Sequence, residues 1–304
     1  MSSNRSNFLL AVGYILVAIL LFDIQGAIIK HLGDRYPVQQ LATFRNLFGL
    51  IPSLLVLYLS SEWHRKGRIF RINRWRLALS RGFFITGAQY CFYLSITKME
   101  LATASTLTYI SPVIITLLSI PILGHKVGGW RWVAVATGFI GVVMIMAPGS
   151  ELFSKYSLLP VGAALGYSLS TVVVRLFDDD IPTALLNLYA SLGSLVGALL
   201  LVLFTGAFIP VASAYDWGWL IAMGLVGGCA VLALISAYRL AQPSSLSPFE
   251  YFGIPFAFII GWVFFNEAPF DKLIPGVFLI VGGGLIIVWR ERYHQQINEE
   301  AELK

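Results

Sequence analysis

The chain has 304 residues, of which 57% are hydrophobic and only 12% are charged. Soluble domains carry roughly 25% charged residues, so this chain has too little charge to cover a water-exposed surface, and most of its surface is expected to face lipid. The net charge of +5 arises from basic residues in short connections between apolar runs. This distribution is typical of membrane topology and does not indicate a nucleic-acid partner.

Ten apolar runs are long enough to form transmembrane helices, because a helix crosses a bilayer in about 20 residues. We expect these helices at about 8–30, 37–59, 76–97, 101–122, 130–147, 155–175, 183–206, 215–238, 245–265 and 271–289. The first run is longer than the apolar part of a signal peptide, so it is predicted to be a retained helix. Residues 292–304 are predicted to form a solvated cytoplasmic tail.

The distribution of Lys and Arg predicts the orientation of the chain. Most of them fall on the side that carries both termini, including the Arg-rich connection at about 60–75. Because positive residues concentrate on the cytoplasmic side, both termini are expected in the cytoplasm. An even number of spans agrees with this placement.

Two halves of the sequence, 1–150 and 151–291, match weakly at a steady spacing. The matched pairs are Lys30 and Arg175, Pro37 and Pro182, Trp75 and Trp217, Gly82 and Gly224, Tyr109 and Tyr251, and Pro112 and Pro255. Each half would hold five helices, and since five is odd, the second half would enter the membrane from the opposite side. The predicted fold is therefore an all-α integral membrane protein with ten transmembrane helices, arranged as two inverted five-helix repeats.

Three charged residues fall inside predicted spans, namely Asp23, Arg45 and Glu250. A charge at this depth costs about 2.5–3.5 kcal/mol on insertion scales, so each side chain is expected to face a polar cavity or a partner. Glu250 follows Pro248 and could bind a substrate amine or a transported proton, or it could pair with Arg45. Arg45 could bind a substrate carboxylate or only neutralise an acid. For Asp23, a local bond to Gln25 or a break in the first helix is the structural alternative.

Polar and aromatic residues accompany these charges on neighbouring helices. A mixed aromatic and polar lining suits a cavity for a small organic molecule, although helix packing alone would also explain each residue. With the three charged residues, the predicted substrate-binding set adds Gln89, Tyr90, Tyr93, Tyr109, Tyr167 and Tyr251.

Other chemistries lack their motifs in this sequence. The four histidines fall in predicted loops or tails without metal-ligand spacing, and no phosphate-binding loop of an ATP-driven pump is present. Cys91 and Cys229 lie inside apolar runs and are interpreted as small hydrophobic residues. We therefore expect no cofactor, no metal and no catalytic residues.

The sequence resembles the drug/metabolite transporter superfamily, in its EamA-type branch, over nearly its whole length. The matching residues are Arg45, the segment 102–105 leading to Ser111 and Pro112, the stretch 247–267, Pro275 with Gly276, and 289–291. The last segments look most like bacterial members that take up S-adenosylmethionine or riboflavin-type substrates. The sequence departs from the family at Gly124-His125, where members often have Gly-Glu.

The resemblance implies a secondary transporter that moves a small organic metabolite across the bacterial inner membrane by alternating access, either as a monomer or as a homodimer. It also implies that helices 1–4 and 6–9 surround a cavity, while helices 5 and 10 are peripheral. Amino-acid-like, nucleoside-like and vitamin substrates all stay open, as does coupling to protons. The alternatives are a proton-independent facilitator, an exporter of amino acids or drugs, a membrane enzyme, or a structural subunit.

Overall fold

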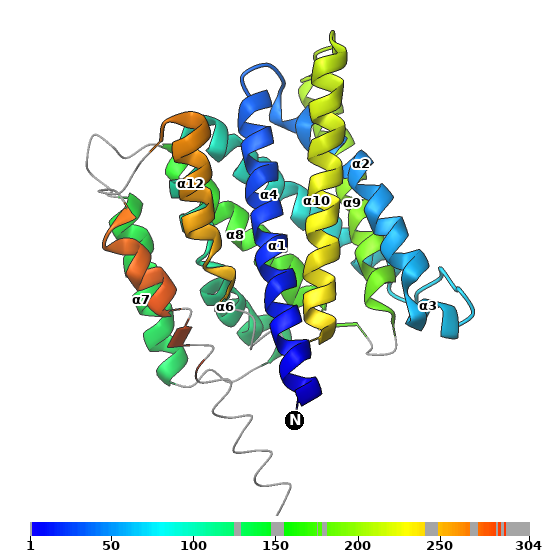
Figure 1. The fold of residues 1–304 in the computed structure, drawn as a ribbon, viewed down its shortest axis with the longest axis horizontal. Helices are drawn as coiled ribbons and strands as arrows, with labels where there is room; N and C mark the ends of the chain where they lie inside the picture. Colours follow the sequence, from blue (N-terminus) through cyan, green and yellow to red (C-terminus); the bar gives the residue numbers. More distant parts are fainter. Residues whose placement is uncertain are drawn as a thin grey trace, which may run out of the picture.

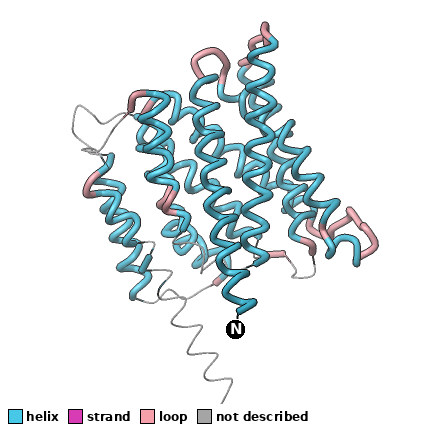
Figure 2. Tube along the Cα trace, in the orientation of Figure 1, coloured by secondary structure: helices cyan, strands magenta, loops and turns pink. Residues whose placement is uncertain are grey.

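The structure is a computed structural model that describes residues 2–124, 129–146, 155–174, 176–177, 181–240, 249–267, 273–283, 285–286 and 289. Within these ranges the regular secondary structure is entirely helical (Figure 2). The predicted tail at 292–304 lies outside the described residues.

The helices follow the predicted apolar runs closely. Their bounds are α1 (Ser2–Leu32), α2 (Val38–Leu59), α3 (Ser61–Arg65), α4 (Trp75–Lys98), α5 (Leu101–Thr108), α6 (Ser111–Leu123), α7 (Gly129–Met146), α8 (Leu159–Val174), α9 (Thr183–Thr205), α10 (Ala214–Leu240) and α12 (Gly253–Phe265). A further helical stretch covers residues 276–283.

Six segments of the described chain are both long and apolar enough to cross a membrane. They are Asn7–Leu32, Val38–Leu59, Leu101–Ile122, Tyr156–Val174, Thr183–Thr205 and Ala214–Ala237. Shorter apolar helices cover Ala136–Ile145 and Gly253–Phe265. These segments establish an all-α, multi-pass membrane protein, because a helix satisfies its own backbone hydrogen bonds in lipid.

One predicted span, 101–122, is divided into the two helices α5 and α6. The division falls at Tyr109 and Ile110, whose amides bond to carbonyls only three residues earlier, those of Thr106 and Leu107. Pro112 is in the first turn of α6, where its missing N–H costs nothing but where it favours a new helix start. The Ser111 hydroxyl donates to the Thr108 carbonyl at 2.8 Å, so the break leaves this carbonyl satisfied.

Most of the helices pack in one bundle, and one pair lies at its edge. α1 packs against α10, α2 against both α9 and α10, and α4 against both α8 and α9. α12 packs against α1 and α5. Figure 1 shows α7 side by side with the orange-red helical stretch 276–283 at one edge of the molecule. Gly141 of α7 is close to Gly276 and Ile280 of that stretch.

The contact between α4 and α9 depends on Gly82. A Cβ atom at this position would overlap backbone atoms of Ala190 and Ser194 on α9. We therefore expect Gly82→Ala to lower the free energy of unfolding by about 1–3 kcal/mol, as overpacking does, which a thermal melt of the detergent-solubilised protein would measure. Gly87→Ala is the matched control on the same helix, since nothing lies within 4 Å of its Cβ position. Equal melting temperatures for the two variants would contradict the expectation.

Candidate substrate cavity

A cavity of about 520 Å³ lies between the helices of the bundle. Its lining comes from α1, α2, α4, α5, α6, α8, α9, α10 and the two residues Glu250 and Tyr251 that precede α12. Neither α7 nor the helical stretch 276–283 contributes a lining residue, in agreement with their place at the edge (Figure 1). A cavity of this volume is within the usual range for a small organic ligand.

Eight of the nine predicted site residues line this cavity. They are Asp23, Arg45, Gln89, Tyr93, Tyr109, Tyr167, Glu250 and Tyr251. Tyr90 is not among the lining residues and packs against a hydrophobic cluster instead. Since successive helical residues are about 100° apart, the face of α4 that carries Gln89 and Tyr93 turns Tyr90 away.

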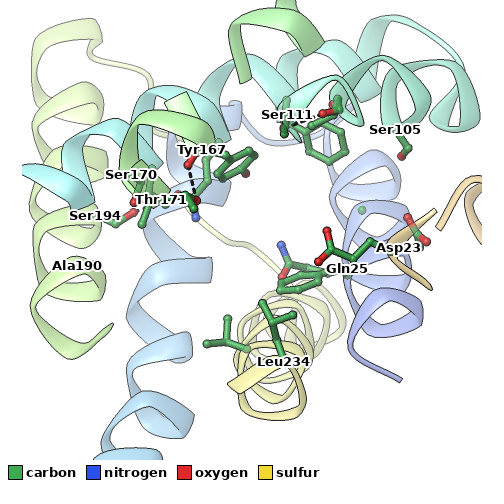
Figure 3. Close-up of a pocket in the computed structure, with 18 of the residues that line it drawn as sticks. Asp23, Gln25, Ser105, Ser111, Tyr167, Ser170, Thr171, Ala190, Ser194 and Leu234 are labelled. Carbon is green, nitrogen blue, oxygen red and sulfur yellow. Dashed lines mark hydrogen bonds between the residues drawn. The ribbon is translucent and has the colours of Figure 1, made fainter. Parts of the chain in front are cut away.

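Asp23 lies on the wall formed by α1, which continues without a break from Ser2 to Leu32. Only 7% of Asp23 is exposed, and its Oδ2 atom has no hydrogen-bond partner among the described residues. Gln25, two residues later, donates to the Tyr93 hydroxyl at 3.2 Å. Figure 3 shows Asp23 and Tyr167 on opposite sides of the space.

Tyr109 and Tyr251 lie together at two helix breaks. Tyr109 separates α5 from α6, and Tyr251 lies in the turn before α12. Their ring centroids are 5.8 Å apart, within the range of favourable aromatic pairs. The Tyr251 hydroxyl is buried without a hydrogen-bond partner among the described residues, and Glu250 is its direct neighbour in the lining.

Arg45 is positioned by a network of buried amides. Its Nη1 donates to Asn46 Oδ1 at 3.1 Å. Asn46 and Gln89 exchange two hydrogen bonds of 2.9 and 3.1 Å, and Asn46 also donates to the Ser194 carbonyl at 3.2 Å. The network therefore joins α2, α4 and α9, and it holds the Arg45 guanidinium in place. Arg45 Nε itself has no hydrogen-bond partner in the described chain.

Several lining residues were absent from the predicted set. Gln25, Asn187 and Ser194 are polar lining residues, and Asn187 Nδ2 is buried without a hydrogen-bond partner in the described part of the chain. A polar side chain in an apolar span is the only sequence signal for them, and packing between helices would produce the same signal. Tyr189 has that signal too, yet it donates outside the cavity to the Phe70 carbonyl at 2.9 Å.

The fold and the cavity define a multi-pass membrane protein with a cavity of small-molecule size among its helices. The chain belongs to the EamA-like transporter family, whose sequence profile matches residues 9–147 and again residues 154–289. This match confirms the resemblance to drug/metabolite transporters and favours transport over an enzymatic function.

Three relatives with assigned substrates illustrate the range of the family. The chain is 22% identical to the S-adenosylmethionine uptake transporter of Rickettsia conorii, over 99% of this chain and 100% of the relative. It is 31% identical to the riboflavin transporter of Brucella anthropi, over 72% of this chain and 76% of the relative. It is 27% identical to the pseudopaline exporter of Pseudomonas aeruginosa, over 93% and 94% respectively.

A solved crystal structure has the same fold. It superposes with a TM-score of 0.60 at 18% sequence identity, and the match covers 95% of this chain and 98% of that one.

Proposed function

We propose that this protein is a secondary transporter that carries a small organic metabolite across the bacterial inner membrane by alternating access, with the cavity as its substrate site. The observation that carries this proposal is a set of buried polar atoms around the cavity, on Asp23, Arg45, Asn187 and Tyr251, that have no hydrogen-bond partner within the described ranges. Unsatisfied buried polar atoms are costly, and a polar solute in the cavity would satisfy them.

Ten spans in two inverted repeats, 1–150 and 151–291, are part of the proposal. The family profile matches the chain twice in tandem, which supports two related halves. The halves correspond if α1 is matched with α8, α2 with α9, α4 with α10, and α5–α6 with α12. The helix contacts then also occur in matching pairs. The contact of α1 with α10 matches that of α8 with α4, and the contact of α2 with α10 matches that of α9 with α4. The direct contacts between α2 and α9 and between α5 and α12 are those expected close to a two-fold axis.

Tyr109 and Tyr251 support the same relation between the halves. They are equivalent positions in the two half-sequences, and their rings are in contact. Equivalent residues meet only close to an axis that relates the halves. In transporters built this way, one repeat moves against the other around a fixed central site, and this tyrosine pair lines such a site.

Both termini are proposed to be cytoplasmic. The N-terminal end of α1 and the basic connection that includes α3 lie toward the same end of the molecule (Figure 1). That connection carries Arg65, Lys66, Arg68, Arg71 and Arg74, and positive residues of this kind concentrate on the cytoplasmic side. The direction of transport is a separate matter, because the relatives include both uptake proteins and an exporter.

A variant that fills the cavity tests the proposal. Thr171→Trp places a large side chain at a lining position of α8, and we expect it to abolish counterflow of labelled S-adenosylmethionine or riboflavin in liposomes preloaded with the same compound. Thr205→Trp is the matched control, since both threonines are exposed and donate to the carbonyl four residues earlier, but Thr205 ends α9 away from the cavity lining. Counterflow that persists in Thr171→Trp would remove the cavity from the transport path.

The same liposomes address the energy source. A proton-coupled transporter requires a carboxylate in the cavity, such as Glu250 or Asp23, that exchanges a proton during the cycle, whereas a facilitator requires none. Net uptake that depends on a pH gradient, combined with counterflow that does not, would indicate coupling to protons.

A further inference from the structure

The two flanks of α1 divide the cavity wall into two chemically different ends. Asp23 and Gln25 both line the cavity, yet they are about 200° apart around the helix axis. One residue therefore contributes to one end of the cavity, and the other residue contributes to the second end.

Asp23 belongs to the end that holds the tyrosine pair. Ile19 precedes Asp23 by four residues and so shares its helix face. Ile19 lies against Gly253 at the start of α12. The Tyr109 hydroxyl lies against Gly253 as well. Asp23, Glu250, Tyr109 and Tyr251 thus form what we call the acidic end of the cavity.

Gln25 belongs to the opposite end. Its Oε1 atom lies against Gly227 of α10. Arg45 Nε is 3.2 Å from the point where a Cβ atom on Gly227 would lie. Gln25 also donates to the Tyr93 hydroxyl at 3.2 Å, and Tyr167 lies across the space from Asp23 (Figure 3). Arg45, Gln25, Tyr93 and Tyr167 form the basic end of the cavity.

Each end suits a different chemical group. At the acidic end, aromatic rings beside a buried carboxylate attract organic cations through both Coulomb and cation–π terms. At the basic end, Asn46 holds the guanidinium, whose Nε–H has no hydrogen-bond partner among the residues that the structure describes. The planar fork of arginine matches a carboxylate. A neutral solute could hydrogen-bond at either end but would leave both charges uncompensated.

Resting on the proposed transport function, we infer that the substrate is a zwitterion whose organic cation is several bonds away from its carboxylate. The cation, a sulfonium or a remote ammonium, lies between Asp23 and the Tyr109–Tyr251 pair, and the carboxylate lies at Arg45. The cavity volume admits a solute of nucleoside or amino-acid-conjugate size.

Three related compounds test this assignment one charge at a time. S-adenosylmethionine carries both groups. S-adenosylhomocysteine lacks the sulfonium charge and keeps only the α-ammonium directly beside its carboxylate, and decarboxylated S-adenosylmethionine lacks the carboxylate. We expect the wild-type protein to bind the first at least roughly tenfold more tightly than either analogue, because each analogue lacks one charge-assisted contact, and such contacts are stronger than neutral ones. Dissociation constants would come from ligand-dependent thermal shifts of the purified full-length protein.

Two variants assign each preference to its end of the cavity. Asp23→Asn should reduce the preference for the sulfonium to near unity and keep the preference for the carboxylate, while Arg45→Gln should do the reverse. Because each readout is a ratio within one variant, a partial loss of folded protein cancels. Glu62→Gln on exposed α3 is the control and should change neither ratio.

The outcomes separate this inference from the transport proposal. Equal affinity for sulfonium and thioether, a preference that survives Asp23→Asn, or no stabilisation by any of the three compounds would overturn the zwitterion assignment. If the protein then shows counterflow of riboflavin and Thr171→Trp blocks it, the transport proposal holds with a different substrate class. If no probe shows counterflow sensitive to Thr171→Trp, the transport proposal itself is wrong.

Discussion

Glu267→Gln is expected to lower the free energy of unfolding by about 2–4 kcal/mol, because Glu267 joins three helices at one end of the bundle. Its Oε1 pairs with Lys30 Nζ at 2.5 Å, and its Oε2 accepts a hydrogen bond from the Leu101 amide at 3.0 Å. Lys30 also donates to the Met99 carbonyl at 2.8 Å. Loss of the carboxylate charge leaves a mostly buried ammonium without its counter-ion, which is costly.

The position of Glu267 explains why one residue has this effect. It follows Asn266, whose left-handed backbone (φ 57°) ends α12, and its own amide bonds to the Gly261 carbonyl at 3.0 Å. The carboxylate then lies at the first amide of α5, where an acid stabilises the helix dipole. α5 has no side-chain cap at Glu100, the residue that precedes it, so Glu267 supplies the cap from a distant part of the chain.

A double-mutant cycle measures this interaction. Lys30→Met should lower the free energy of unfolding as Glu267→Gln does. Because the two residues are in contact, the double variant should lose less stability than the sum of the two single losses. Arg35→Met is the comparison, because Arg35 pairs with Asp216 at 2.9 Å while half of its side chain is exposed, and exposed pairs contribute about 0–1 kcal/mol. Thermal or chemical unfolding in detergent measures the stability of each variant. Losses of stability that add up in the Lys30–Glu267 cycle would contradict a direct coupling.

The interaction between Lys30 and Glu267 is a part of the structure that the sequence could not predict. The charge pattern placed Lys30 at a span end, and Glu267 entered only as part of a family motif. Their pairing depends on how α12 packs against α1 and α5, which no local pattern encodes. The equivalent position in the first half of the sequence is His125, which lies outside the described residues.

The sequence predicted the cavity residues better than the contacts between them. Asp23, Arg45 and Glu250 line one cavity because a charge inside a span is costly wherever the helices pack, and this argument needs no tertiary detail. Tyr90 failed the same expectation, because an aromatic residue is equally stable against apolar neighbours. The break at Tyr109 has a local cause in Pro112, but the prediction treated 101–122 as one span since hydropathy does not register a break.

The amide network around Asn46 gives the second large effect. Asn46→Leu removes the hydrogen bonds that hold Arg45 and leaves the Gln89 side-chain amide without its main partner. A buried polar group that loses its partner costs about 1–3 kcal/mol, and Gln89 is only 2% exposed. We expect a lower melting temperature together with a loss of ligand binding of roughly tenfold or more, because Arg45 would no longer be held in place.

A double variant separates the structural role of this network from its role in binding. Gln89→Met alone should destabilise less than Asn46→Leu does, because Asn46 would still accept from Arg45 Nη1 and donate to the Ser194 carbonyl. Replacing both partners with apolar side chains of similar shape removes the unsatisfied groups, so the double variant should regain much of the stability. It should not regain binding, because Arg45 Nη1 still lacks its acceptor at Asn46. Recovery of binding along with stability would mean that the network only supports the fold, and that Arg45 needs no partner on α2 to act on a substrate.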